Sequence, residues 1–247
     1  MEFDLLTFVL VGFGAQLVDG ALGMAFGTIS STLLVALGVP PAAASAGVHA
    51  VEMVTTGVSG LSHTLHRNVN WSLFRRLVVP GVIGGVLGAY VLSNVPASVA
   101  KPFVLTYLMA IGAILLWRGL FRMPMAREPW LVAPLGLAGG FLDAAGGGGW
   151  GPVVTGNLLV QGSDPRKTIG TVNSSEFFLA TATSITFLSQ LGWEVLTHAT
   201  LGLLIGGVAA APFGAFLAKR IPAKTLLMLV GTVLIATSGY GVWKALS

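Results

Sequence analysis

The sequence predicts an all-α protein that crosses a membrane several times and consists of two homologous halves. Three observations favour this fold class: a low charge content, recurring apolar runs and an internal repeat. The 247 residues are 54% hydrophobic and only 9% charged, whereas soluble domains carry about 25% charged residues. The apolar runs are long enough to cross a hydrocarbon core of roughly 30 Å.

Residues 124 positions apart match one another along much of the chain. The repeat includes all four acids that lie within apolar segments, so chance is a poor explanation. It predicts two halves, residues 1–122 and 123–247. The matched pairs are Gly12 with Gly136, Asp19 with Asp143, Gly27 with Gly151, Pro41 with Pro165, and Glu52 with Glu176.

Each half is expected to contain four apolar segments, eight in all. In the first half they are Leu5–Gly38, Ala42–Leu65, Phe74–Leu92 and Val99–Trp117. In the second half they are Leu131–Gly162, Lys167–Leu191, Leu196–Ala218 and Thr225–Val242. The opening segment of each half is too long for one ordinary span, and an aspartate with glycines interrupts it.

The basic residues indicate how the opening segments are threaded. A single crossing by each would divide the basic residues seven against six, whereas entry and return to the same side leaves only Lys101 and Lys244 opposite the other eleven. The second arrangement satisfies the positive-inside rule; two full crossings would also satisfy it, but the arms are short. We therefore expect three spans plus a re-entrant or broken helical hairpin per half, which makes the halves an inverted repeat. The eleven are Arg67, Arg75, Arg76, Arg118, Arg122, Arg127, Arg166, Lys167, Lys219, Arg220 and Lys224.

The stretch "DAAGGGGWGP" is irregular backbone inside an apolar segment, which is tolerated only where it is buried in protein or lines a cavity. A helix starting at its proline would present free amides and a positive dipole end, which suit an anion. The alternative is that the glycines only allow helices to pack closely. The candidate substrate-binding residues are Gly23, Gly27, Ser30 and Ser31 in the first half, and Gly146, Gly147, Gly148, Gly149, Trp150, Thr155 and Asn157 in the second.

The second segment of each half carries a polar stripe. His49 and Glu52 share one face of the first, and Asn173 and Glu176 hold the same places in the second. Ionisable residues within a membrane indicate a pathway, a proton relay or a mutual pair. The two glutamates are candidate proton- or ion-coupling groups, with His49 and Asn173 as candidate substrate contacts; alternatively, the glutamates only cap neighbouring groups. Asp19 and Asp143 are candidate titrating groups, Na⁺ ligands or hairpin caps.

Two related halves, each opening with a glycine-rich apolar segment, resemble the TauE/SafE family of sulfite exporters. The stretches that carry the resemblance are "GGFLDAAGGGGWGPVV" and, more weakly, "GFGAQLVDGALGMAFGTISS". The resemblance implies transport of small sulfur-containing or organic anions such as sulfite or sulfoacetate. The first half departs from the pattern, because Gly23 and Gly27 flank Met-Ala-Phe where a glycine run would be expected.

The leading functional hypothesis is a secondary anion transporter that works by alternating access, coupled to H⁺ or Na⁺, as a multi-pass protein of the cell membrane. Four buried acids and no Lys or Arg deep inside the apolar segments suit a cation carrier as well. A channel remains open, and a membrane enzyme using His49 and Glu52 is a weaker alternative. No metal, cofactor or nucleic acid is expected, since cysteine is absent and the basic residues cluster at segment ends. Oligomeric state stays open.

Overall fold

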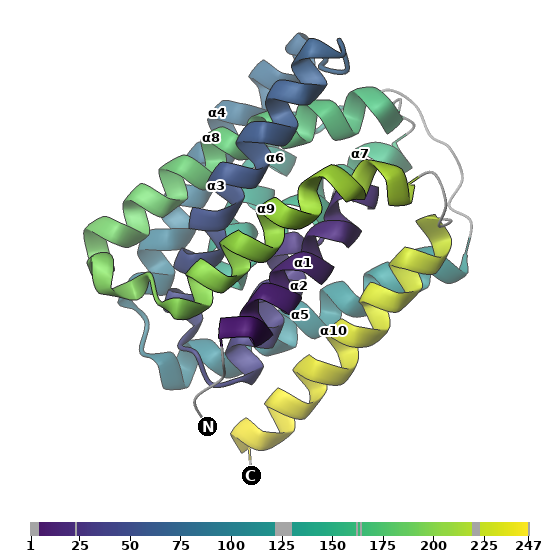
Figure 1. Cartoon of the computed structure of the whole chain (residues 1–247). Coiled ribbons are helices and arrows are strands. Elements are labelled where there is room, and N and C mark those ends of the chain that lie inside the picture. The colour runs from purple at the N-terminus through teal and green to yellow at the C-terminus, as the bar shows by residue number, and fades with distance from the viewer. Residues whose placement is uncertain are drawn as a thin grey trace.

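The computed structural model describes residues 5–22, 24–121, 130–161, 163, 165–218 and 223–246. All regular elements within these ranges are helices, which confirms the all-α class (Figure 1). The predicted boundary between the halves, at residues 122 and 123, lies outside the described residues.

The helices fall into two runs of similar order. The first run contains α1 (Leu5–Leu22), α2 (Phe26–Ala36), α3 (Pro41–Leu65), α4 (Trp71–Asn94) and α5 (Ala97–Leu120). The second contains α6 (Val132–Gly146), the π-helix η1 (Trp150–Thr155), α7 (Gly156–Val160), α8 (Pro165–Leu191), the short 3₁₀ helix η2 (Trp193–Val195), α9 (His198–Ala218) and α10 (Ala223–Leu246). We call α1 with α2 the first hairpin, and α6 with η1 and α7 the second hairpin.

Each hairpin is broken in the middle. The first breaks between Leu22 and Phe26 and the second between Gly146 and Trp150. The arm after the first break has 11 residues, a length of about 16 Å at 1.5 Å per residue. The arm after the second break, η1 with α7, has 6 plus 5 residues, the same number. Neither arm is long enough to cross a membrane alone.

The most extensive helix contacts join the two runs. α1 packs on α9, α6 packs on α4, α3 packs on α8, and α5 packs on α10; in Figure 1, α5 and α10 lie together along one side of the bundle. Glycine makes the closest approaches, since a Cβ on Gly12 would collide with the backbone of Leu203, and one on Gly136 would lie 3.0 Å from the carbonyl oxygen of Leu77. Small residues play this role between helices in membranes.

Apolar and polar residues are distributed as a lipid environment requires. Large apolar side chains such as Leu10, Val79, Phe103 and Ile185 are more than half exposed on the outside of the bundle, while polar and ionisable side chains are buried within it. Among the described residues, α4 and α5 are long and apolar enough, by length and composition, to cross a membrane. The interior is therefore where a polar site has to lie.

Candidate functional site

Both hairpin aspartates cap the helix that follows the break. Asp143 Oδ1 accepts hydrogen bonds from the amides of Gly149 (2.7 Å) and Trp150 (2.8 Å). Asp19 Oδ1 accepts one from the amide of Phe26, at 3.3 Å. A carboxylate in this place satisfies amides that have no partner within the helix. The amides expected to receive an anion at Gly149 and Trp150 are thus already bonded to a carboxylate of the chain.

The two breaks touch each other. α6 ends at Gly146; Gly147, which caps it, has φ +75°, and Gly148 follows with φ +135°, conformations that favour glycine. A Cβ on Gly148 would overlap the backbone amide of Thr28, and one on Gly151 would lie 2.5 Å from the Cβ of Met24. The absence of side chains at these glycines therefore lets the break of the second hairpin pack directly against the break of the first, at Met24 and Thr28.

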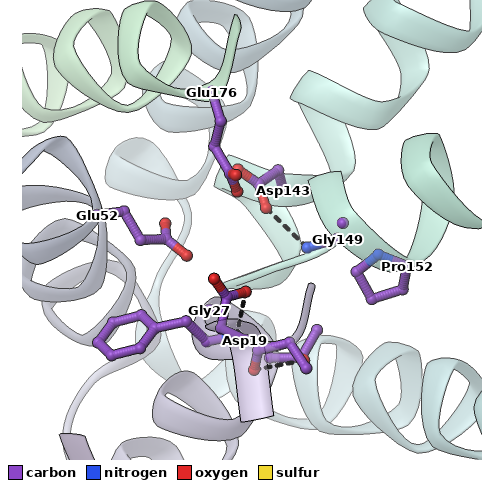
Figure 2. Close-up of a pocket in the computed structure, with 11 residues that line it drawn as sticks. Asp19, Gly27, Glu52, Asp143, Gly149, Pro152 and Glu176 are labelled. Carbon is purple, nitrogen blue, oxygen red and sulfur yellow. Dashed lines mark hydrogen bonds between the residues drawn. The ribbon is translucent and has the colours of Figure 1, made fainter. Parts of the chain in front are cut away.

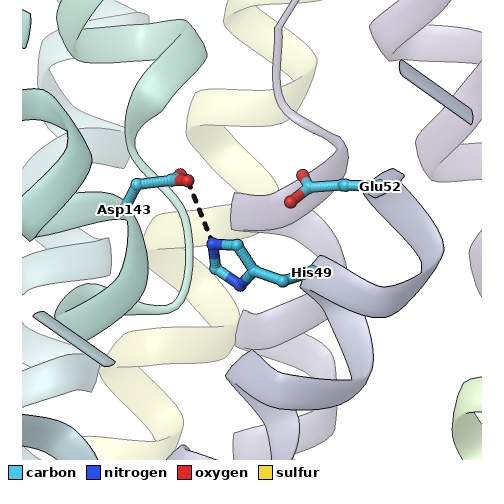
Figure 3. Close-up of side chains that lie close together, drawn as sticks. All are labelled: His49, Glu52 and Asp143. Carbon is cyan, nitrogen blue, oxygen red and sulfur yellow. Dashed lines mark hydrogen bonds and ion pairs between the residues drawn. The ribbon is translucent and has the colours of Figure 1, made fainter. Parts of the chain in front are cut away.

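His49 links α3 to the second hairpin (Figure 3). Its Nδ1 lies 2.8 Å from the carbonyl oxygen of Ser45, and its Nε2 lies 3.1 Å from Asp143 Oδ2. A carbonyl oxygen only accepts, so Nδ1 carries a proton, and a further proton must lie between Nε2 and the carboxylate. The imidazole is fully buried. His49 and Asp143 therefore form a buried, charge-assisted pair that holds a proton.

Four carboxylates line one small cavity where the hairpins meet (Figure 2). They belong to Asp19, Glu52, Asp143 and Glu176, which come from α1, α3, α6 and α8 and point toward one another. The cavity has room for about one water molecule. No Lys or Arg is among the described residues that line it. Buried carboxylates need a proton, a cation or a hydrogen-bond donor as a partner.

Glu52 has one buried carboxylate oxygen without a hydrogen-bond partner among the described residues. This oxygen is Oε2, and the side chain is 4% exposed. A Cβ on Gly27 would lie 2.8 Å from Glu52 Oε1, so the glycine leaves the space that this carboxylate occupies. Glu52 is thus held by packing in the cavity wall with one oxygen free.

The other candidate substrate-binding residues lie at varying distances from the acids. Gly27 and Gly149 line the cavity, whereas Gly23 lies outside the described residues. Ser30, Ser31 and Thr155 are fully buried, and their hydroxyls lack partners within the described ranges. Of the remaining candidates, Gly146 packs on Tyr107, Gly147 on Ser31, Gly148 on Thr28, and Asn157 donates to the carbonyl of Val153, while Asn173 is buried on α8.

Trp150 contributes its amide to the site but not its ring. The indole is fully buried, donates from Nε1 to the carbonyl of Val172 at 3.3 Å, and packs with Leu73 and Leu77. It does not line the cavity. The ring therefore wedges the second hairpin against α4 and α8.

Sequence reasoning missed several residues around the site. Ser45 orients His49 and also donates from its hydroxyl to the carbonyl of Ala144; its place one turn before His49 on the same helix face was the available signal. Thr28 and Pro152 line the cavity and are themselves 124 positions apart. Tyr107 packs against the glycine turn, and no local pattern indicates it.

One donor atom each of His49, Glu52 and Asp143 lies within 4.8 Å of the others. Such a set is chemically able to hold a metal ion. In the observed arrangement, however, His49 Nε2 already faces Asp143, so a metal ion would have to replace the proton between them.

Comparisons with known proteins agree with the resemblance carried by the glycine-rich stretches. The family model described as sulfite exporter TauE/SafE matches residues 8–241. The chain is also 44% identical over 240 residues to a protein of Bacillus subtilis (strain 168) described as "Probable membrane transporter protein YtnM", which covers 94% of this chain and 80% of that protein. No solved structure matches the chain.

Proposed function

The chain belongs to the TauE/SafE family of sulfite exporters, and from this premise we propose that it carries small sulfur-containing or organic anions, such as sulfite or sulfoacetate, by alternating access. Family membership and the similarity to a membrane transporter make the chain a membrane transporter. The nature of its cargo, the coupling ion and the mechanism are the proposal.

The observation that carries the proposal is the cavity formed where the two hairpins touch. Each predicted half contributes two of the four carboxylates that line the cavity. The first arm of each hairpin also packs on a helix of the other predicted half, α1 on α9 and α6 on α4. Transporters built from inverted repeats place their site at such a junction of broken helices. Rocking of one hairpin against the other opens the junction to each side in turn.

We propose that H⁺ is the coupling ion. An anion cannot approach four charged carboxylates without neutralisation, and the cavity has room for about one water molecule. Protons taken up by Glu52 and Glu176 reduce the repulsion without needing more space, and His49 already pairs with Asp143. The free oxygen of Glu52 is the place where a proton can be added without breaking an existing hydrogen bond.

The proposed topology is multi-pass in the cell membrane, with three spans and one re-entrant hairpin per half. The 11-residue second arm of the first hairpin supports it, as does the division of the basic residues. We propose that the protein acts as a transporter and not as an enzyme, since the role proposed for the carboxylates at the cavity, uptake and release of protons, involves no covalent change in the cargo.

The test is uptake of radiolabelled sulfite and sulfoacetate into proteoliposomes, with and without a pH gradient. The wild type is compared with the double variant Glu52→Gln/Glu176→Gln and with Glu194→Gln, which changes an exposed glutamate in η2. We expect saturable uptake that follows the pH gradient in the wild type and the control, and loss of the gradient dependence in the double variant. Gradient-driven uptake that persists in the double variant contradicts the role of the glutamates.

A cation carrier is the second candidate, because the described lining of the cavity holds four acids and no basic side chain. Radiolabelled Na⁺ uptake into the same liposomes tests it. Saturable Na⁺ flux in the absence of sulfite and sulfoacetate, lost in the double variant, favours this candidate over the anion carrier.

A further inference from the structure

A half-buried arginine reaches the second hairpin from a neighbouring helix. Arg118 lies in the last turn of α5, where the sequence places it among the basic residues at a membrane edge. Its Nη1 donates to the carbonyl of Pro152 at 3.4 Å. A Cβ on Gly156 would overlap this Nη1, so the glycine makes the space in which the guanidinium lies.

Among the described residues, no carboxylate forms an ion pair with Arg118. Arg118 Nε is buried and has no hydrogen-bond partner within the same ranges, and the bond to Pro152 is long. Guanidinium has five N–H donors, and leaving a partly desolvated charge with so few partners is costly. The arrangement is therefore one that a bound anion would complete.

The arginine contacts a residue that lines the acidic cavity. Pro152 lines the cavity, and its carbonyl is the one that Arg118 contacts. Pro152 belongs to η1, a π-helix, and π-helical turns occur frequently at functional sites. An anion on Arg118 would thus lie beside a residue of the proposed pathway, although Arg118 itself is not among the described residues that line the cavity.

We propose that Arg118 binds the transported anion, as the cationic recognition group at the second hairpin; this assignment rests on the proposed function. The planar guanidinium fork suits oxygens of a sulfite, sulfonate or carboxylate group, which it can bind through two parallel hydrogen bonds. The assignment also explains how a site lined by four acids could accept an anion. Arg118 would bind the anion, and the acids would bind the coupling proton.

The repeat supports the assignment from the sequence side. Trp117 and Arg118 are followed 126 positions later by Trp243 and Lys244, at the shift that also aligns Leu77 with Leu203. A basic residue after tryptophan therefore recurs at the end of the last helix of both predicted halves.

The experiment measures KM and kcat for radiolabelled sulfite in proteoliposomes. The variants are Arg118→Gln, which removes the charge; Arg118→Lys, which keeps it without the fork; and Gly156→Ala, which keeps Arg118 but fills its space. Arg76→Gln is the matched control, since Arg76 is exposed in α4. One charged hydrogen bond is worth about 1.5–3 kcal/mol, so Arg118→Gln should raise KM by roughly 10- to 100-fold. Arg118→Lys and Gly156→Ala should raise it less, and Arg76→Gln should leave it within about two-fold.

A KM increase with kcat nearly unchanged supports anion binding, because a purely structural defect lowers the active fraction and leaves KM intact. A KM for sulfite within about two-fold of the wild type in Arg118→Gln overturns the assignment. If that variant does not fold, unchanged KM values in both Arg118→Lys and Gly156→Ala overturn it equally. If the wild type itself shows no saturable flux of sulfite or sulfoacetate, the proposed function is contradicted, and the assignment of Arg118 falls with it.

Discussion

Asp19 and Asp143 occupy equivalent places in the two hairpins, and each accepts a hydrogen bond from the amide seven residues later. Asp143 has three partners, at 2.7, 2.8 and 3.1 Å, and is 2% exposed. Asp19 is half-buried, and its one described hydrogen bond is 3.3 Å long. The second hairpin is thus tied to α3 through His49, whereas the described residues at the break of the first hairpin show one long capping bond.

Two substitutions between the halves account for the difference. His49 in α3 corresponds to Asn173 in α8, which cannot form a charged pair with a carboxylate. Ala25 corresponds to Gly149, whose extended backbone lets two successive amides turn toward Asp143. A sequence repeat therefore preserves the position of a functional group without preserving the strength with which the group is held. In a transporter, the weaker hairpin is the one that we expect to open first.

The largest expected effect comes from removing each aspartate charge. Asp143→Asn leaves His49 without its ionic partner, and breaking a buried pair costs about 3–5 kcal/mol. Asp19→Asn keeps a side-chain oxygen that can accept the long bond from the Phe26 amide, so it should cost less than about 1 kcal/mol. Thermal unfolding of both variants in detergent measures the difference. Equal losses would mean that the two hairpins are held alike.

His49→Asn makes α3 resemble α8 at this position and removes the pair from the other side. We expect a fall in sulfite flux of about ten-fold or more, because Asp143 then keeps its charge without a cation beside it. The exchange variant His49→Asn/Asn173→His moves the imidazole to α8. Flux should stay low in it, since Asp19 lacks the two strong amide bonds of Asp143; full recovery would show that either hairpin can be the tied one.

The smallest expected effect concerns the breaks themselves. Ala25 has φ +101°, a conformation that costs a non-glycine residue roughly 1–2 kcal/mol. Ala25→Gly should therefore stabilise the protein, by about 1 kcal/mol at most once the entropy of glycine is included. Gly149→Ala should destabilise it, because the added methyl group would overlap the Tyr107 hydroxyl. Melting temperatures of the two variants should move in opposite directions.

Much of the site could be predicted from the sequence because the repeat marks it. The four acids that meet at the cavity are the same acids that recur 124 positions apart, and the all-α class follows from composition. The cap on Gly149 could not be predicted, since it depends on how the chain turns at Gly147 and Gly148. The contact of Arg118 could not be predicted either, because it joins α5 to a carbonyl 34 residues away, and the repeat does not indicate that these two residues meet.

The packing of each hairpin on a helix of the other half has a consequence for how the chain is made. Gly12 on α1 packs against Leu203 on α9. Because α9 comes much later in the chain, the ribosome makes the first hairpin well before the helix that it packs on. Until α9 arrives, the glycine-lined face of α1 has nothing to pack on, and contacts this distant along the chain form late in folding. The packing of α1 therefore stays incomplete until α9 has been synthesised. A chain truncated before α9 should be degraded in the cell, whereas supplying the missing half as a separate polypeptide should protect it.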